Sequence, residues 1–378
     1  MKKSHLIITI ILLSISTIYS QNKIKCIPAT NFQTVINGRQ TSLYTLTNSN
    51  GMTVQITNYG ARVVALWVPD KNGDFQDVVW GYNSIQEYLK STDIYCGPIV
   101  GRYGNRINKG QFSLNNNNYQ LTINNNGNHL HGGSKGFECK VWDAKLINVD
   151  GNQAVELSYT SPDGEEGYPG NLTIKVTYIV TNNNELKINY SATTDATTII
   201  NPTSHCYFNL SGTAANTILS HQLIINALKY TPVAKGLIPT GELLPVKGTP
   251  LDFTRFTAIG ARIGTPNEQL ALGKGYDHNY VLNKKSGESG IAAEIYSDQT
   301  GIIMKVITDQ PGLQFYSGNF MDGTLTGKRG DIHAYRTGFA LEAQNYPDAP
   351  NHQNFPSAVL NPGETYTHAT SYAFGIKK

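Results

Sequence analysis

The chain is poor in charged residues, in basic tracts and in long hydrophobic runs. Only 15% of its 378 residues are charged, and the formal net charge is +3. A charge this small gives no reason to expect nucleic acid or an anionic membrane surface as a partner. Beyond residue 20 no apolar run is long enough to cross a bilayer. These absences predict a soluble protein that binds neither nucleic acid nor membrane.

Cysteine is also scarce, and the cysteines show no CxxC spacing. The four are Cys26, Cys96, Cys139 and Cys206. An exported protein can form disulfides, but a chain of this length can bury a hydrophobic core without them. We therefore expect mostly free, buried thiols, although the spacing allows one bridge.

Residues 1–20 differ in character from the rest of the chain. Lys2 and Lys3 give a basic start, Leu6 to Ile18 is apolar, and Ser20 precedes an expected cleavage site at Gln21. This pattern is typical of a secretory signal peptide and is too short for a membrane span. It predicts an exported protein, periplasmic or extracellular, whose mature part retains a net charge of +1 after loss of the two lysines.

Alternating apolar residues dominate the mature chain. Every second residue is apolar over 172–180, three asparagines follow at 182–184, and the alternation resumes over 186–190. This pattern predicts a β-hairpin with one buried face. Similar patterns occur at Val54–Ile56, Val155–Tyr159 and Ile302–Ile307.

Helix signals are few, and neither a linker nor a repeat divides the chain. Ser84 and Glu87 form a capping box that predicts one short helix. The 36 glycines and 22 tyrosines suit many strands joined by tight turns. We predict an all-β fold in which residues 21–378 form one large antiparallel β-sandwich domain.

One carboxylate lies where carboxylates are rare. Glu342 follows the apolar run Phe339–Leu341, which we expect to be a short buried strand, and a buried glutamate is costly unless other groups compensate it. Four polar segments could supply those groups: Asn105–Ile107, His129–Gly133, Asn201–His205 and Gly275–Asn279. Together they indicate an acid–base site.

Each candidate in these segments also has a simpler interpretation. Arg106, in a glycine-rich segment, could hold sugar hydroxyls or a carboxylate, or it could be an ordinary surface arginine. His131 precedes two glycines, so we expect it at a strand-to-loop junction. With His129, His205 and Asp277 it could bind a metal, but a single HxH pair is weak evidence for a metal site.

The two remaining candidates are a histidine and an aspartate. His205 is expected on an aromatic strand, where a hydrogen-bonded core histidine is the commoner outcome. Its neighbour Cys206 would point to the opposite face of that strand, which excludes a cysteine–histidine nucleophile pair. Asp277 and Glu342 could be a glycosidase pair, although an aspartate in such a segment is more often a turn cap.

Taken together and in order, these segments resemble the aldose 1-epimerases, or galactose mutarotases. The segments that carry the resemblance are Asn105–Ile107, Leu130–Gly133, Thr203–Leu210, Leu251–Thr254, Gly275–Asn279, Leu313–Asn319, Leu341–Asn345 and Pro362–Tyr366. The resemblance extends from about Thr41 to the C-terminus. It implies a single large β-supersandwich with an open sugar-binding cleft, a free aldose as substrate, and no metal or organic cofactor.

The resemblance also implies a role for each site residue. Glu342 matches the general base, His205 the general acid, and His131 a second histidine that helps to hold the ring oxygen. The residues that match substrate-positioning residues are Arg106, Asp277, Gln314 and, less closely, Asn105. For this chemistry we expect Glu342 and His205 to lie close together, with the histidine charged and the glutamate ionised at rest.

Three other functions compete with this interpretation. An exported sugar-binding protein would need no matched acid and base, so Glu342 and His205 argue against it. A glycoside hydrolase would use Asp277 and Glu342. A sugar-phosphate epimerase would need several clustered basic residues, and only Arg106 is placed for that purpose.

Overall fold

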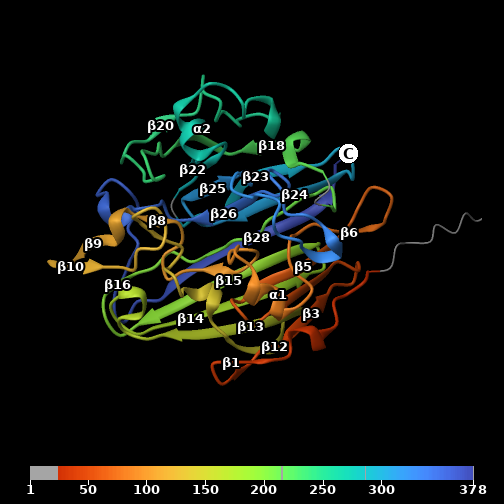
Figure 1. Cartoon of the computed structure of the whole chain (residues 1–378), viewed down its shortest axis with the longest axis horizontal. Helices are drawn as coiled ribbons and strands as arrows, with labels where there is room; N and C mark the ends of the chain where they lie inside the picture. Colours follow the sequence, from red (N-terminus) through yellow and green to blue (C-terminus); the bar gives the residue numbers. More distant parts are fainter. Residues whose placement is uncertain (1–23, 214–215, 286, 378) are drawn as a thin grey trace, which may run out of the picture.

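The computed structural model of the chain describes residues 24–213, 216–285 and 287–377. The expected signal peptide lies outside these residues. Antiparallel strands dominate the described part, which holds only two short α-helices, α1 (Ile85–Lys90) and α2 (Glu268–Gly273) (Figure 1). None of its helices is both long and apolar enough to cross a membrane. The predicted all-β fold with few short helices is confirmed.

The largest sheet has nine antiparallel strands, in the order β12-β13-β14-β15-β28-β24-β23-β18-β21. Their bounds are Asp143–Val149 (β12), Asn152–Ser161 (β13), Leu172–Thr181 (β14), Glu185–Thr194 (β15), Tyr366–Ile376 (β28), Ile302–Thr308 (β24), Gly290–Tyr296 (β23), Gln222–Ile225 (β18) and Thr257–Ala258 (β21). The predicted hairpin is β14–β15, with Val180 opposite Leu186. The C-terminal strand β28 lies at the centre of the sheet, between β15 and β24.

Two smaller sheets lie beside it. The five-stranded sheet has the order β20-β19-β22-β25-β26 and the four-stranded sheet the order β3-β4-β5-β6. Their strands are Leu244–Pro245 (β20), Ala227–Tyr230 (β19), Asp277–Leu282 (β22), Gly312–Tyr316 (β25), Ala340–Gln344 (β26), Leu43–Thr47 (β3), Thr53–Thr57 (β4), Arg62–Pro69 (β5) and Phe75–Asp77 (β6). As predicted, the run ending in Glu342 is a strand, and every residue of β26 is buried.

Short strand pairs complete the structure. They are β1 (Val35–Ile36) with β2 (Arg39–Gln40), β7 (Ile99–Val100) with β17 (Thr203–Ser204), β8 (Arg106–Ile107) with β11 (His129–Leu130), β9 (Gln111–Leu114) with β10 (Asn117–Gln120), and β16 (Thr198–Ile199) with β27 (Val359–Leu360). The asparagines at 182–184 form the turn between β14 and β15, as expected, and Asn184 adopts a positive φ there. The pairs β7–β17 and β8–β11 bring segments from the first half of the chain to the edge of β26.

One large hydrophobic core joins the sheets. On β14 the inward residues Leu172, Ile174 and Val176 are fully buried, and they alternate with exposed residues. The same cluster includes Phe315 and Leu341 from the five-stranded sheet. Burying one such side chain contributes about 1.5–3 kcal/mol, so this shared core fixes the position of β26 relative to the large sheet.

The helices and cysteines match the predictions only in part. The Ser84 hydroxyl caps α1 by accepting from the Glu87 N–H, as expected, but α2 was not predicted. The Asn267 side chain caps α2 by accepting from the N–H groups of Gln269 and Leu270, and a single capping residue is a weak signal for a six-residue helix. All four cysteines are free in the described structure, but the expectation of burial is wrong for Cys26, which is exposed, and only partly right for Cys139.

Candidate active site

The polar segments singled out in the sequence meet at one cavity of about 560 Å³. Six of the seven expected site residues line it: Asn105, Arg106, His131, His205, Asp277 and Glu342. The seventh, Gln314, lies on β25 directly opposite Glu342 of β26, and its amide donates to Asp277 (2.6 Å). The cavity therefore combines residues from five separate segments of the sequence.

Glu342 is held by the strand on which it lies. β26 is paired with β25 along its whole length, and the Glu342 side chain is only 3% exposed. Its Oε1 lies 3.7 Å from Nε2 of His205, whereas Oε2 has no hydrogen-bond partner among the described residues. A buried carboxyl oxygen without a partner is unusual and leaves this group ready to accept a proton or a hydrogen bond from a ligand.

His205 lies just beyond β17, which ends at Ser204. The expected aromatic strand is therefore wrong at this point, because His205 follows the strand instead of lying within it. The histidine still points away from Cys206, which is part of the hydrophobic core. Its ring packs edge-on against the rings of His131 (5.0 Å between centroids) and Tyr207 (4.9 Å). These contacts leave Nε2 directed at Glu342.

His131 lies at the strand-to-loop junction expected from the sequence, directly after β11. Its backbone has φ = 52°, and the main chain of Asn105 holds it twice. The N–H of His131 donates to the Asn105 carbonyl (3.0 Å), and the N–H of Asn105 donates to Nδ1 of His131 (3.0 Å). Since Nδ1 is the acceptor, the proton of the neutral ring is on Nε2, which can donate into the cavity.

Arg106 and Asp277 lie beside each other in the same cavity. A guanidinium nitrogen of Arg106 lies 3.9 Å from a carboxylate oxygen of Asp277, and the other carboxylate oxygen accepts from Gln314. Burial raises the pKa of Asp277, while Arg106 and Gln314 oppose the shift by favouring the ionised form. This arrangement offers a sugar both fixed donors and fixed acceptors.

Burial opposes the charged forms of both Glu342 and His205. It raises the pKa of Glu342 well above its usual value, and the negative charge of Asp277 raises it further, against the effect of Arg106. Burial lowers the pKa of His205 to about 4. The charged histidine and ionised glutamate that we expect for the reaction therefore need support from other charges or hydrogen bonds, because desolvation acts against both.

The expected group of possible metal ligands is not brought together. Nδ1 of His129 lies 2.7 Å from the Thr122 carbonyl and Nε2 lies 2.6 Å from the Tyr168 hydroxyl, so both of its ring nitrogens are engaged away from the cavity. The ligand atoms of His131, His205 and Glu342, however, all lie within 4.8 Å of one another. These three could hold a transition metal ion, although the positive charge of Arg106 opposes cation binding.

Several cavity residues were not foreseen from the sequence. Aromatic side chains form much of the wall: Tyr95, Tyr207, Tyr316, Phe320 and His333. The ring of Tyr95 lies 4.8 Å from that of His131 and 5.8 Å from that of His205. No local pattern distinguishes these aromatics from core residues, and only the presence of 22 tyrosines hinted at such a surface.

Comparison with known proteins places the chain among relatives of one kind. The family model described as aldose 1-epimerase matches residues 42–373. The galactose mutarotase of Sus scrofa is 42% identical over 328 residues, which cover 87% of this chain and 92% of the relative. The aldose 1-epimerase of Escherichia coli is 36% identical over 340 residues, or 89% and 96% of the two chains.

A solved structure agrees with these matches. The aldose epimerase homologue from C. elegans superimposes with a TM-score of 0.81 at 30% sequence identity, covering 89% of this chain and all of that one. The strand arrangement and the sequence similarity thus point to the same group of proteins.

Proposed function

This chain belongs to the aldose 1-epimerase family, and on that premise we propose that its cavity binds a free aldose such as galactose, with Glu342 as general base and His205 as general acid. The enzyme is an isomerase that interconverts the α and β anomers by opening and reclosing the sugar ring. The observation that carries the residue assignment is the 3.7 Å distance between the Glu342 carboxylate and Nε2 of His205.

This pair suits the proton transfers of the reaction. Ring opening requires the anomeric hydroxyl to lose a proton while the ring oxygen gains one. A base and an acid that are positioned for these two steps each contribute rate factors of about 10²–10⁴. After the aldehyde rotates about its C1–C2 bond, the same two groups reverse their roles and close the ring on the other face.

Sugar binding is expected to favour the ionised form of Glu342 and the charged form of His205. Among the described residues Oε2 of Glu342 has no donor, and burial favours the protonated carboxyl. A sugar hydroxyl that donates to this oxygen stabilises the carboxylate, as does the nearby guanidinium of Arg106. A proton released from Glu342 has an acceptor in Nε2 of His205, 3.7 Å from Oε1. Substrate thus promotes the ionised base and the charged acid that the reaction needs.

The other site residues would orient the sugar. His131 presents an Nε2 proton that can hold the ring oxygen or a neighbouring hydroxyl, because its Nδ1 is occupied by Asn105. Arg106 and Asp277 offer a donor and an acceptor, and Gln314 fixes the Asp277 carboxylate. Fixed contacts of this kind hold the reacting atoms in the orientation that ring opening needs.

Polarimetry on freshly dissolved α-D-galactose and α-D-glucose tests the proposal, with wild type and Glu342→Ala compared at equal concentration. Acceleration by wild type that disappears in the variant is the expected result. An active Glu342→Ala enzyme would refute the assigned base. A wild type no faster than the spontaneous reaction on both sugars would favour a non-catalytic sugar-binding protein.

We also propose that the enzyme is exported and acts on sugars that glycosidases release outside the cytoplasm as single anomers. The proposal is supported by the basic, apolar and small-residue pattern of residues 1–20. Cell fractionation and N-terminal mass analysis of the full chain and of a chain lacking residues 2–20 test it. The full chain should be exported and begin at Gln21, and the truncated chain should stay in the cytoplasm. Retention of both in the cytoplasm would refute export.

A further inference from the structure

We propose that Glu166 is a positioning residue for His131, acting together with Tyr168 from one turn that holds the His131 segment on both sides. The turn consists of residues 162–168, in the connection between β13 and β14, and the segment consists of residues 129–135. Neither Glu166 nor Tyr168 lines the cavity, and the proton transfers described above do not use them. The inference rests on the proposed role of His131 in binding the sugar.

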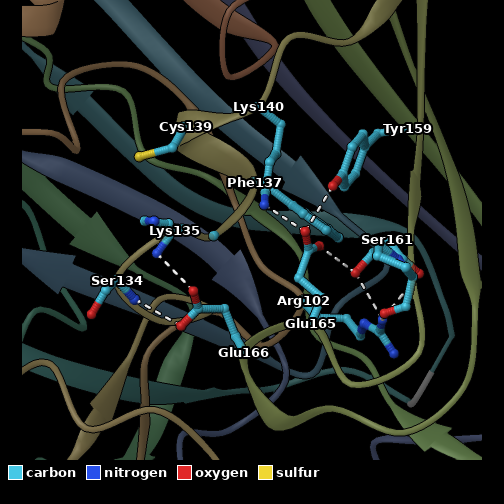
Figure 2. A network of polar contacts seen from close by, with 12 residues as sticks. Arg102, Ser134, Lys135, Phe137, Cys139, Lys140, Tyr159, Ser161, Glu165 and Glu166 are labelled. Atoms are coloured by element: carbon cyan, nitrogen blue, oxygen red, sulfur yellow. Dashed lines mark hydrogen bonds and ion pairs between the residues drawn. The ribbon is translucent and has the colours of Figure 1, made fainter. Parts of the chain in front are cut away.

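The Glu166 side chain holds the part of the segment that follows His131. Its two carboxylate oxygens accept from consecutive main-chain N–H groups, Oε2 from Ser134 (3.0 Å) and Oε1 from Lys135 (3.0 Å) (Figure 2). Hydrogen bonds to a carboxylate are stronger than those between neutral groups. Gly133 has φ = 107°, and a side chain there would approach Oε2 to 2.1 Å, so only glycine permits this contact.

Tyr168 and the Glu166 main chain hold the part of the segment that precedes His131. The Glu166 carbonyl accepts from the N–H of Thr122 (3.1 Å), and the Thr122 carbonyl lies 2.7 Å from Nδ1 of His129. Burial lowers the pKa of His129 to about 4, so its ring is neutral. Because a carbonyl only accepts, the ring proton is on Nδ1, and Nε2 accepts from the Tyr168 hydroxyl (2.6 Å).

His131 therefore lies in the middle of a segment that is bonded to the same turn before and after it. Its own main chain and ring are bonded to Asn105. Only Gly132 and Gly133 separate it from the residues that Glu166 holds, and both have positive φ values. Glycine populates many backbone conformations, so these two residues do not fix the path of the loop by themselves. The Glu166 carboxylate selects the path that places His131 against Asn105.

The turn is itself held by the network of polar contacts in Figure 2. The Glu165 carboxylate pairs with the ammonium group of Lys140 and accepts from the hydroxyls of Tyr159 (2.8 Å) and Ser161 (2.6 Å). The Ser161 hydroxyl in turn accepts from the Arg102 guanidinium (2.7 Å). Tyr159 and Ser161 belong to β13 of the nine-stranded sheet, so the turn is a fixed support for the loop.

The Glu166→Ala variant tests this role, because it removes both acceptor oxygens. Its kcat on α-D-galactose should fall by about tenfold, since displacing a binding group by about 1 Å can cost about a hundredfold. Glu166→Gln keeps one acceptor oxygen and should fall between wild type and Glu166→Ala. Asp195→Ala is the matched control, because this exposed carboxylate also accepts two hydrogen bonds, both from Asn171, outside the His131 segment. Its kcat should equal that of wild type.

A double-variant cycle separates the positioning of His131 from a general loosening of the fold. If Glu166 acts through His131, the loss caused by Glu166→Ala should disappear in a His131→Gln background, where no imidazole is left to position. A loss of the same size in both backgrounds would overturn the proposal. A Glu166→Ala enzyme with the wild-type kcat would overturn it as well.

NMR gives a readout that does not depend on activity. The ring signals of His131, identified by their absence in His131→Gln, should shift in Glu166→Ala and stay unchanged in Asp195→Ala. Unchanged signals in Glu166→Ala would refute the proposal, even if the wild type proved inactive on every aldose. If Glu166→Ala does not fold, the same measurements are made on Glu166→Gln. An active wild type, an inactive Glu342→Ala and an unaffected Glu166→Ala would together reject this inference alone.

Discussion

Replacing Glu342 by glutamine should nearly abolish catalysis while the protein becomes more stable. Glutamine keeps the shape of the side chain and its place in β26 but cannot take the anomeric proton. A positioned base contributes about 10²–10⁴ in rate, so kcat should fall by about 10³, or about 4 kcal/mol in activation free energy. KM should change much less, because the amide still bonds a sugar hydroxyl.

The stability change follows from the buried carboxyl. The pKa of Glu342 in the folded protein is raised above the value of 4.5 for a free side chain, so folding takes up a proton at any pH between the two values. The contribution of this carboxyl to the stability of wild type is therefore complete below pH 4.5. It is lost as pH rises from 4.5 toward the folded pKa, at about 1.4 kcal/mol per pH unit. Glutamine does not titrate, so the Glu342→Gln variant does not lose this contribution. The Tm of the variant should therefore exceed that of wild type by an amount that grows as pH rises.

Polarimetry on α-D-galactose gives kcat and KM, and thermal unfolding at about pH 5 and about pH 8 gives the stability difference. Glu364→Gln is the matched control, because this exposed glutamate bonds only Asn361. Its activity and Tm should equal those of wild type. A Glu342→Gln enzyme within about tenfold of the wild-type kcat, or one whose Tm advantage over wild type does not grow as pH rises, would refute the reasoning.

Two further variants test residues of the site, and a third tests a buried ion pair elsewhere in the fold. His205→Gln should lower kcat by about 10²–10³. The double variant with Glu342→Gln should be only slightly slower than Glu342→Gln alone, since the two groups act as one unit. Fully additive losses would contradict this. Arg106→Lys should raise KM by about tenfold with a smaller change in kcat, because lysine cannot reproduce the two-pronged geometry of the guanidinium; an unchanged KM would count against the contact. Lys328→Met should destabilise the protein by about 3–5 kcal/mol in urea unfolding, because the buried ammonium lies 2.7 Å from Asp77 and its loss leaves that carboxylate unpaired; a shift below about 1 kcal/mol would show that the pair is dispensable.

The strand pattern could be predicted because it depends on neighbours in sequence. The alternation over 172–190 determined the β14–β15 hairpin, since a strand with one buried face needs an apolar residue at every second position. The capping box at Ser84 predicted α1 in the same way. Helix α2 was missed, because a single capping asparagine is a weak signal for six residues. The identity of the site residues also came from the sequence, through the ordered polar segments and a glutamate in an apolar run.

What only the tertiary structure decided is how those residues meet and how strongly they are desolvated. Glu342 and His205 are brought to 3.7 Å by pairing between strands that are far apart in the chain. The Nε2–H form of His131 follows from an Asn105 N–H that only the folded β8–β11 edge supplies. The expected protonation states rested on the neighbouring charges and not on desolvation, which cannot be read from a sequence. Desolvation depends on how completely the whole fold excludes water from the pair, and here it outweighs the neighbouring charges.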